Sequence, residues 1–177
     1  MKRIWLLTFT LAVMALGAIG HAEGTLRIVP LVRDEQVIVS VDLNNGYSEE
    51  VRQVIAGGVR TTFTYNVDLK MIVPAWVDRT IASVVVTVID EYDTLTRVHS
   101  LSRTVDGRVV DALATKDESA AKKWLTSLEG LTLCRTSRLD PHREYYVRIS
   151  AHVRPPGATL LGWANGVTNL AKFTFVP

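Results

Sequence analysis

Cysteine is almost absent from this sequence, and its scarcity removes several classes of protein. Cys134 is the single cysteine among 177 residues. One thiol cannot form an internal disulfide, a zinc site built on cysteines or a C-x-x-C redox motif. The composition also lacks the bias of a collagen or a coiled coil. With 47% apolar residues, it is that of a folded globular domain.

Catalytic and nucleotide-binding motifs are missing as well. The chain contains no G-x-S-x-G elbow, no H-E-x-x-H pair, no Walker loop and no G-x-G-x-x-G turn. Its four histidines are scattered and lack the spacing of metal ligands. We therefore expect a protein that is not an enzyme and that holds no metal or cofactor.

The first 22 residues are predicted to be a cleaved secretory signal peptide. Lys2 and Arg3 precede an uncharged run of 17 residues from Ile4 to Gly20, and small residues then precede Glu23. The run is short for a membrane span, which needs about 20 apolar residues. The alternative is an inner-membrane anchor formed by residues 4–20. Residues 23–177 are expected to be one β-rich envelope domain, exported to the periplasm.

The charge balance argues against nucleic acid as a partner. Without Lys2 and Arg3 the chain has 18 basic and 18 acidic residues. A domain of zero net charge has no long-range field that would gather nucleic acid or anionic lipid. Membrane attachment is expected only if the N-terminal segment is retained.

Alternating apolar and polar residues dominate the rest of the chain. Odd positions from Val59 to Met71 are mostly apolar and even positions mostly polar, which predicts a half-buried antiparallel strand. Residues 36–43 alternate similarly and turn back, through residues 33–36, on a strand at 25–32. Pro30 places that first strand at a sheet edge. The β-branched run at 80–91 predicts a central strand covered on both faces.

Further strands are predicted at residues 95–102, 131–138, 144–153 and 172–176, and Asp106-Gly107 predicts a type I′ hairpin turn. Ser48 is expected to cap a helix that ends near Ala56, and Thr115 to begin the capping box of a second helix. That second helix would pack through Ala121, Trp124, Leu125 and Leu128. The fold class is therefore mainly β: a β-sandwich or strongly curved antiparallel sheet of about eight or nine strands, with two short covering helices.

Two segments are candidate binding surfaces. One face of the strand at 144–154 carries residues that would suit an anionic ligand such as a glycan or lipid headgroup, namely Tyr146, Arg148, His152 and Arg154. A plain solvated sheet face is the alternative. The Gly- and Pro-rich segment 155–169 carries apolar residues that would contact a protein partner or cover the core, namely Leu160, Leu161 and Trp163.

Two other features have plainer interpretations. The acidic cluster of Asp90, Glu91 and Asp93 is interpreted as a solvated turn, because neighbouring residues of a strand point to opposite faces and cannot converge on one ligand. Cys134 lies in an alternating segment without a nearby histidine, which predicts a small buried hydrophobic residue and not a nucleophile.

Several short motifs resemble a known family. These are Gly58-Val59, Phe63-x-Tyr65-x-Val67-x-Leu69, Trp76-x-Asp78 and Tyr92-Asp93-x-Leu95-Thr96, together with the late Pro155-Pro156, Leu160-Leu161 and Trp163 region. The chain resembles, from about Leu26 to Phe173, an uncharacterised family of exported bacterial proteins catalogued as domain of unknown function 4390. It departs from the family at Val98 and His99, where members tend to place a second aromatic residue. The family offers no catalytic residues to transfer.

The resemblance also implies a setting for the protein. Members of the family are often encoded near membrane-bound sensor kinases, which implies a role in the cell envelope. The leading expectation is an exported β-domain that binds another envelope protein, with a membrane-bound sensor kinase as the partner that the resemblance implies. The alternative is a small carrier or sensor domain for a lipid or an anionic glycan. A carrier would enclose an apolar cavity, whereas an interaction domain would have a filled core.

Overall fold

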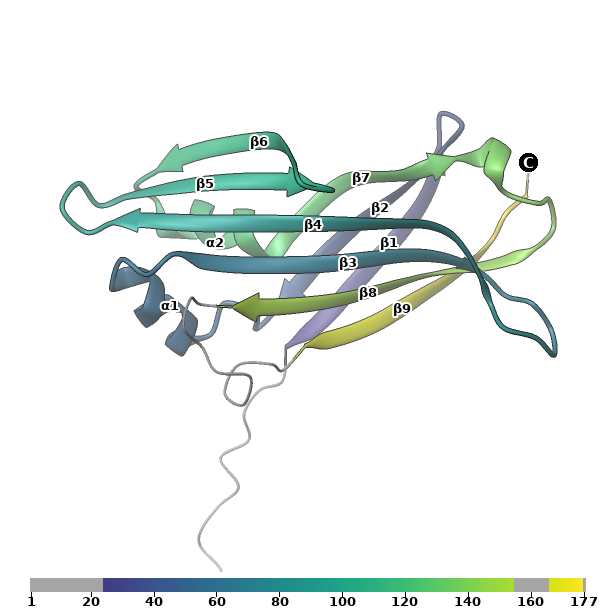
Figure 1. Ribbon diagram of the computed structural model, residues 1–177, viewed down its shortest axis with the longest axis horizontal. Helices are drawn as coiled ribbons and strands as arrows, with labels where there is room; N and C mark the ends of the chain where they lie inside the picture. The colour runs from purple at the N-terminus through teal and green to yellow at the C-terminus, as the bar shows by residue number, and fades with distance from the viewer. Residues whose placement is uncertain (1–23, 155–165, 177) are drawn as a thin grey trace, which may run out of the picture.

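The computed structural model describes residues 24–154 and 166–176, and these residues form a mainly β fold with two short helices (Figure 1). This confirms the predicted fold class. No helix in these ranges is long and apolar enough to cross a bilayer. The elements in chain order are β1 Thr25–Arg33, β2 Gln36–Asn44, α1 Glu49–Ala56, β3 Thr61–Met71, β4 Arg79–Asp93, β5 Val98–Val105, β6 Arg108–Thr115, α2 Glu118–Thr126, β7 Ser127–Arg135, a short 3₁₀ helix Thr136–Arg138, β8 Glu144–Arg154 and β9 Val167–Thr174.

The strands form two antiparallel sheets. The larger sheet has the order β6-β5-β4-β3-β8-β9, and the smaller sheet, of order β1-β2-β7, crosses behind it (Figure 1). The sheets meet where β1 lies beside β9, and the Asn169 side-chain amide donates a hydrogen bond to the Leu26 carbonyl at 2.6 Å. Helix α2 joins β6 to β7 and contacts both sheets away from that corner. The architecture is a curved sandwich, closed along β1 and β9 and covered by a helix elsewhere.

Strand β3 shows why the alternating sequence forms this sheet. Its apolar positions are buried and belong to one continuous core, and Phe63, Val67 and Leu69 are at most 1% exposed. Its polar positions face outward and pair in register with outward residues of β4 and β8. The Tyr65 hydroxyl donates to the Leu125 carbonyl at 2.6 Å, which ties the sheet to α2. Burial raises the pKa of this hydroxyl, so it remains a donor at ordinary pH.

Both predicted hairpins are confirmed. Asp34 and Glu35 join β1 to β2 with φ angles of 50° and 58°. Asp106 and Gly107 join β5 to β6 with φ angles of 49° and 78°. Positive φ at both central positions is the type I′ geometry, whose twist matches that of the flanking strands.

The first helix begins as predicted and the second does not. The Ser48 hydroxyl accepts a hydrogen bond from the Val51 amide and caps α1. Helix α2 is capped by Asp117, whose carboxylate accepts from the Ser119 amide at 2.8 Å, while the predicted cap Thr115 accepts from the Asp117 amide outside the helix. A carboxylate also interacts favourably with the positive end of the helix dipole, which favours this start. Leu128 lies in β7 and not on the helix.

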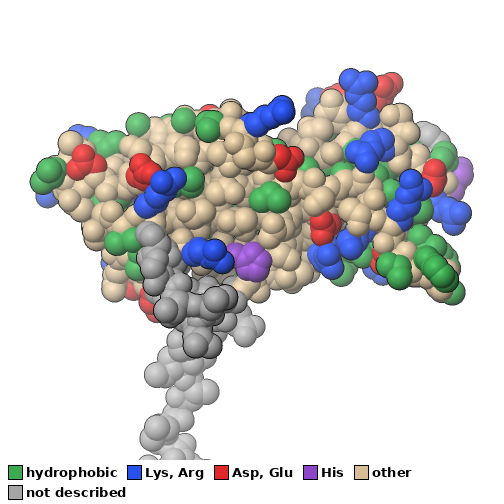
Figure 2. Space-filling view, viewed as in Figure 1, with side chains coloured by type: hydrophobic (Ala, Val, Ile, Leu, Met, Phe, Trp, Pro, Cys, Tyr) green, Lys and Arg blue, Asp and Glu red, His purple; other side chains and the backbone are tan. Residues whose placement is uncertain are grey.

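The prediction that β4 is covered on both faces was wrong. Its residues alternate between buried and exposed, and Val85 is 39% exposed. The outer face of the larger sheet is covered by no described element, so the β-branched residues on that side of β4 meet solvent. Figure 2 views this face, on which charged side chains gather most densely at the right-hand end.

Three strand boundaries also differ from prediction. β5 begins at Val98 and not at residue 95, because the residues before it form a turn. β7 spans Ser127–Arg135, whereas a strand at residues 131–138 was predicted. β9 begins at Val167, inside the segment predicted to be a loop. Pro30 does lie in an edge strand, as predicted, since β1 is the outer strand of the smaller sheet.

Candidate interaction surfaces

The loop predicted to contact a partner is only partly within the described residues. Leu160, Leu161 and Trp163 lie outside them. The end of the predicted loop is strand: Asn169 belongs to β9 and bonds to Leu26. The partner-contact role of the other three residues therefore stays a prediction.

The predicted anionic-ligand residues do share a face. Tyr146, Arg148, His152 and Arg154 occupy alternate positions of β8 on the outer side of the larger sheet. Arg148 forms an ion pair with Asp68 at 3.0 Å, so its charge is partly neutralised. His152 packs closely against Gly166, where an added Cβ would overlap the imidazole ring. Ligand binding at this face stays a prediction.

Asp68 is held ionised by its neighbours. Partial burial by itself would raise the pKa of Asp68, but the hydrogen bonds from Arg148 and from the Ser83 hydroxyl outweigh burial and lower the pKa below its usual value. The carboxylate joins β3, β4 and β8 across the outer face. The Asp68 carboxylate therefore stabilises the sheet by holding these three strands together.

The loop between β3 and β4 presents two apolar side chains to solvent. Trp76 is 81% exposed and Val77 is 79% exposed. We call residues 74–77 the Trp76 tip. It projects at one end of the larger sheet (lower right in Figure 1), where Figure 2 shows apolar side chains next to Lys and Arg side chains. Neither Trp76 nor Val77 contributes to the core, so the fold does not require them to be apolar.

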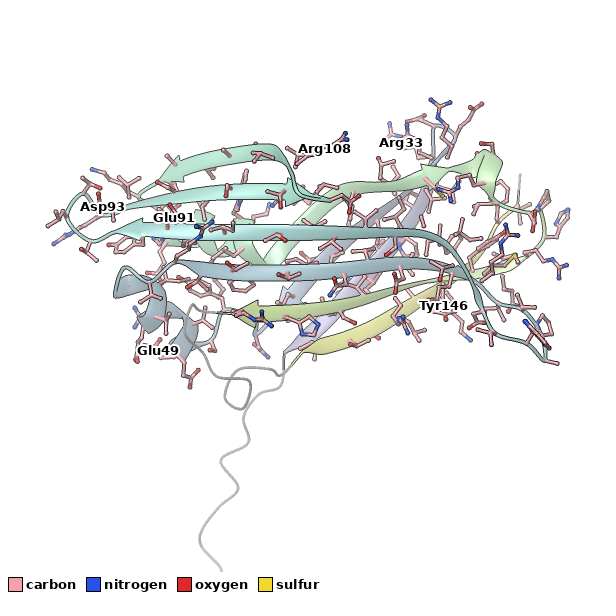
Figure 3. All side chains as sticks on the ribbon, viewed as in Figure 1. Arg33, Glu49, Glu91, Asp93, Arg108 and Tyr146 are labelled. Carbon is pink, nitrogen blue, oxygen red and sulfur yellow. The ribbon has the colours of Figure 1, made fainter. Side chains whose placement is uncertain are left out.

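Asp78 organises this tip. One carboxylate oxygen accepts from the Val73 amide at 3.3 Å, and the other accepts from the Tyr146 hydroxyl at 2.9 Å. The Trp76 amide donates to the Val73 carbonyl at 3.2 Å, which closes the turn. Tyr146 lies at the root of the loop (Figure 3). The Trp76-x-Asp78 motif is therefore a preformed turn: Asp78 fastens it to β8, and Trp76 extends from it.

A second turn at the other end of β4 is built on the same principle. Asp93 accepts hydrogen bonds from the Leu95 and Thr96 amides at 2.8 and 3.1 Å. These two bonds lower the pKa of Asp93. Leu95 is 92% exposed as a result. We call residues 93–97 the Leu95 turn.

Strand β6 is a free sheet edge. In the described part of the chain its one strand neighbour is β5, and it forms the outer strand of the larger sheet (top of Figure 1). Seven of its eight residues are exposed, including Val109 at 70%. β6 contains neither proline nor lysine, which are common protections of free edges. An apolar free edge is a template for pairing with another strand.

The β6 edge also has features that limit indiscriminate pairing. Arg103 pairs with Asp111 and Thr104 with Val109, so Val110 is an extra residue in a bulge. The Asp111 carboxylate accepts from the Ala112 amide at 2.9 Å, and this donor is thereby occupied within β6. A bulge and an edge carboxylate both disfavour nonspecific pairing. A specific partner would need to suit both.

The acidic cluster on β4 was misinterpreted at Asp90. Asp90 is fully buried, and its carboxylate lies 2.8 Å from Nδ1 of His99, which is also buried. Burial raises the pKa of Asp90, against the lowering effect of His99. The other carboxylate oxygen has no hydrogen-bond partner among the described residues. The Tyr92 ring lies 4.5 Å from the His99 ring and shields the pair from solvent.

Sequence reasoning missed this pair because its two residues meet only through the β4–β5 register. Tyr92 lies directly opposite His99, which places Asp90 and His99 diagonally on the inner face. Asp90 and His99 are both buried, so a substrate could not reach the pair without a rearrangement. We assign it the role of orienting β4 and β5.

Other chemical candidates have structural explanations. Cys134 is buried, as predicted, and burial raises the pKa of its thiol, which disfavours the reactive thiolate. Within residues 24–154 and 166–176, no three potential metal ligands cluster. A solvent-open hollow of about 500 Å³ is lined by Glu35, Arg135, Thr136, Ser137, Leu139 and Phe175. It lies at the surface and not between the sheets.

The family was identified by comparing the chain with known proteins. A family model described as "Domain of unknown function (DUF4390)" matches residues 26–155. No curated protein and no solved structure matches the chain. The matched range begins in β1 and ends beside β8, so it covers both sheets except β9. The resemblance noted in the short motifs is thus confirmed, and the chain belongs to the DUF4390 family.

Proposed function

We propose that this protein is an exported, non-enzymatic β-domain of the bacterial envelope that binds an extended segment of another envelope protein along the free edge of β6. The observation that carries the proposal is the exposure of β6: a largely apolar strand with one strand neighbour among the described residues, on which seven of eight residues are exposed. Strand addition uses the unpaired backbone groups of such an edge for affinity and the adjacent side chains for specificity.

The details of β6 define the partner segment. Val109, Ala112 and Ala114 face outward with the solvent side of the sheet, while Asp111 and Leu113 face inward. A matching strand would therefore be apolar on the outward side and would place a lysine or arginine near Asp111. Self-pairing is less suitable, because two antiparallel copies would bring their Asp111 carboxylates close together. A membrane-bound sensor kinase remains the partner class that the family resemblance favours.

Site-specific crosslinking in cells tests this proposal. A photoreactive amino acid replaces Val109 in the full chain, and the same group replaces Leu95 as a control, since Leu95 is also exposed and lies on the turn before β5, at the opposite end of β5 from Val109. We expect one specific adduct from position 109 and none from position 95. An adduct of twice the chain's mass would indicate self-pairing and would contradict the proposal.

The substitution Ala112→Pro is designed to prevent strand addition at the β6 edge. The Ala112 amide donates to Asp111, so proline at this position keeps the pairing with β5, and its ring hinders the addition of a strand at the edge. We expect the adduct from position 109 to disappear while the melting temperature changes little. An unchanged adduct would show that the capture does not use strand pairing.

Export is part of the same proposal. N-terminal sequencing of the protein recovered from cells should find a chain that begins near Glu23. An intact Met1 in the membrane fraction would instead support an anchor formed by residues 4–20.

The second candidate, a carrier or sensor for a small anionic ligand, is favoured by one observation. The hollow that contains Arg135 has a suitable volume of about 500 Å³. Its openness and its place outside the core make it the weaker candidate. Arg135→Ala would abolish binding of such a ligand and leave the β6 adduct intact, which separates the two functions.

A further inference from the structure

The Trp76 tip combines features that are usually found apart. It exposes an indole and a valine on a turn that Asp78 and Tyr146 hold in place. A flexible loop would hide such residues by collapsing onto the domain, whereas this turn keeps them extended. A preformed apolar projection has little entropy to lose on binding.

Basic side chains surround the root of the tip. Tyr146 lies directly between Lys70 of β3 and Lys172 of β9 on the outer face. Exposed Arg79 follows Asp78 in the chain and pairs with Met71, at an inner-face position of the sheet end. No ion pair joins any of these three cations to a described residue. At the start of β8, the charges of exposed Arg143 and Glu144 offset one another. The root is therefore locally cationic, although the domain beyond residue 22 has no net charge.

We propose that the Trp76 tip docks on the surface of an anionic phospholipid bilayer, with Trp76 and Val77 at the headgroup level and with Lys70, Arg79 and Lys172 contacting lipid phosphates. Indole side chains partition to the membrane–water interface, and nearby lysines and arginines add electrostatic attraction to anionic lipids. This site is distinct from the β6 edge, which needs a peptide backbone as its partner.

The shape of the tip favours a bilayer over a protein. A specific protein interface buries about 800 Å² on each partner. A turn of four residues that projects from the sheet end offers much less area, and Figure 2 shows it as a protrusion. Interfacial insertion needs only a few apolar side chains with cations behind them.

Fluorescent labels at the two ends of β4 test the proposal. An environment-sensitive fluorophore is attached to the full chain at Val77→Cys or, as the control, at Leu95→Cys, since both positions are highly exposed. Cys134 is buried, and the chain without an added cysteine gives the background. The labels report on each end separately, so attachment through residues 4–20 does not mimic the result.

Vesicles of phosphatidylcholine with and without phosphatidylglycerol are then added. We expect a blue shift at position 77 only when phosphatidylglycerol is present, and no shift at position 95. Added salt should weaken the shift, because it screens the lysines. The double variant Lys70→Glu and Lys172→Glu should require about tenfold more lipid for the same shift.

Three results would overturn the proposal. One is an unchanged fluorescence of the label at position 77 on anionic vesicles, which would favour a protein as the partner of the tip. Another is an equal shift at positions 77 and 95, which would mean nonspecific adsorption. The third is an identical lipid requirement for the charge-reversed variant with an unchanged melting temperature.

Discussion

The two edges of the larger sheet differ in whether another strand lies beside them. At one edge β9 lies beside β1, with Asn169 bonded to the Leu26 carbonyl and the Phe173 ring stacked on the buried Tyr145 ring. At the other edge β6 has β5 on one side, and no strand of the described ranges lies on the other. The first edge is closed by the protein itself, and the second is left to solvent.

This difference separates the residues that stabilise the fold from the residues that are available for binding. Residues near β9 are buried between the sheets and should determine stability. The apolar residues of β6 are exposed and contribute little to it, so their apolar character requires another explanation, which strand pairing provides. The comparison predicts that equal substitutions at the two edges have unequal effects on the free energy of unfolding.

The largest effect is expected at the closed edge. Ile149, fully buried, pairs with Asn169 of β9 and Val67 of β3. Ile149→Ala removes three buried carbons and should lower the free energy of unfolding by about 2–5 kcal/mol. Urea denaturation measures the change. A loss below 0.5 kcal/mol, roughly the size of a surface effect, would show that this edge is not packed as described.

A smaller effect is expected from the bond that joins the sheets. Asn169→Ala removes the donor to the Leu26 carbonyl and should cost about 0.5–1.5 kcal/mol. Thr168→Ala, on the neighbouring outward position, removes only an exposed hydrogen bond to Ser150, so it serves as the control and should cost less. Equal losses would mean that the corner of β1 and β9 does not depend on this bond.

At the free edge the effect on stability should almost vanish. Val109→Lys places a charge on an exposed strand position and should change the free energy of unfolding by less than about 0.5 kcal/mol. The same variant should prevent pairing with a partner strand, since lysine protects free edges. Crosslinking from an unchanged neighbouring position, Leu113, checks this. Strong destabilisation by Val109→Lys would remove the distinction between the two edges.

The smallest effect concerns pH on the outer face. The folded pKa of Asp68 is below its usual value, so the stability that it contributes is present above that usual value and is lost as pH falls through the folded pKa. Stability curves of the native protein and Asp68→Asn should therefore converge as the pH drops below about 4. Comparing the two proteins isolates Asp68 from Asp90, whose raised pKa acts in the opposite direction. Parallel curves would contradict the role of the Arg148 bond.

Local patterns in the sequence were sufficient for much of the fold. Alternation predicted β3 because a strand with one buried face must place apolar residues at every second position. The type I′ turn at Asp106-Gly107 followed from residues that tolerate positive φ, whereas at residues 33–36 a turn was predicted without its type. The same reasoning failed at β4, because β-branched residues are compatible both with burial and with an exposed sheet face.

The candidate surfaces were harder to predict because they depend on long-range pairing. Tyr146 and Asp78 are 68 positions apart and meet only after β3, β4 and β8 align. The exposure of Trp76 follows from that contact, although the Trp76-x-Asp78 motif was visible. The Asp106-Gly107 turn was predicted, but the strand that follows it was not assigned, and the place of β6 at the sheet edge depends on the order of all six strands.

Strand β4 also sets the distance between two turns of the domain. Its 15 residues, extended at about 3.3 Å each, separate the Trp76 tip from the Leu95 turn by about 50 Å. The electrostatic screening length under physiological salt is about 8 Å, so a charge bound at one end is not felt at the other. Each turn is fastened by its own aspartate and does not rely on the opposite end. The two turns are therefore held at a fixed separation, and each keeps its geometry independently of the other.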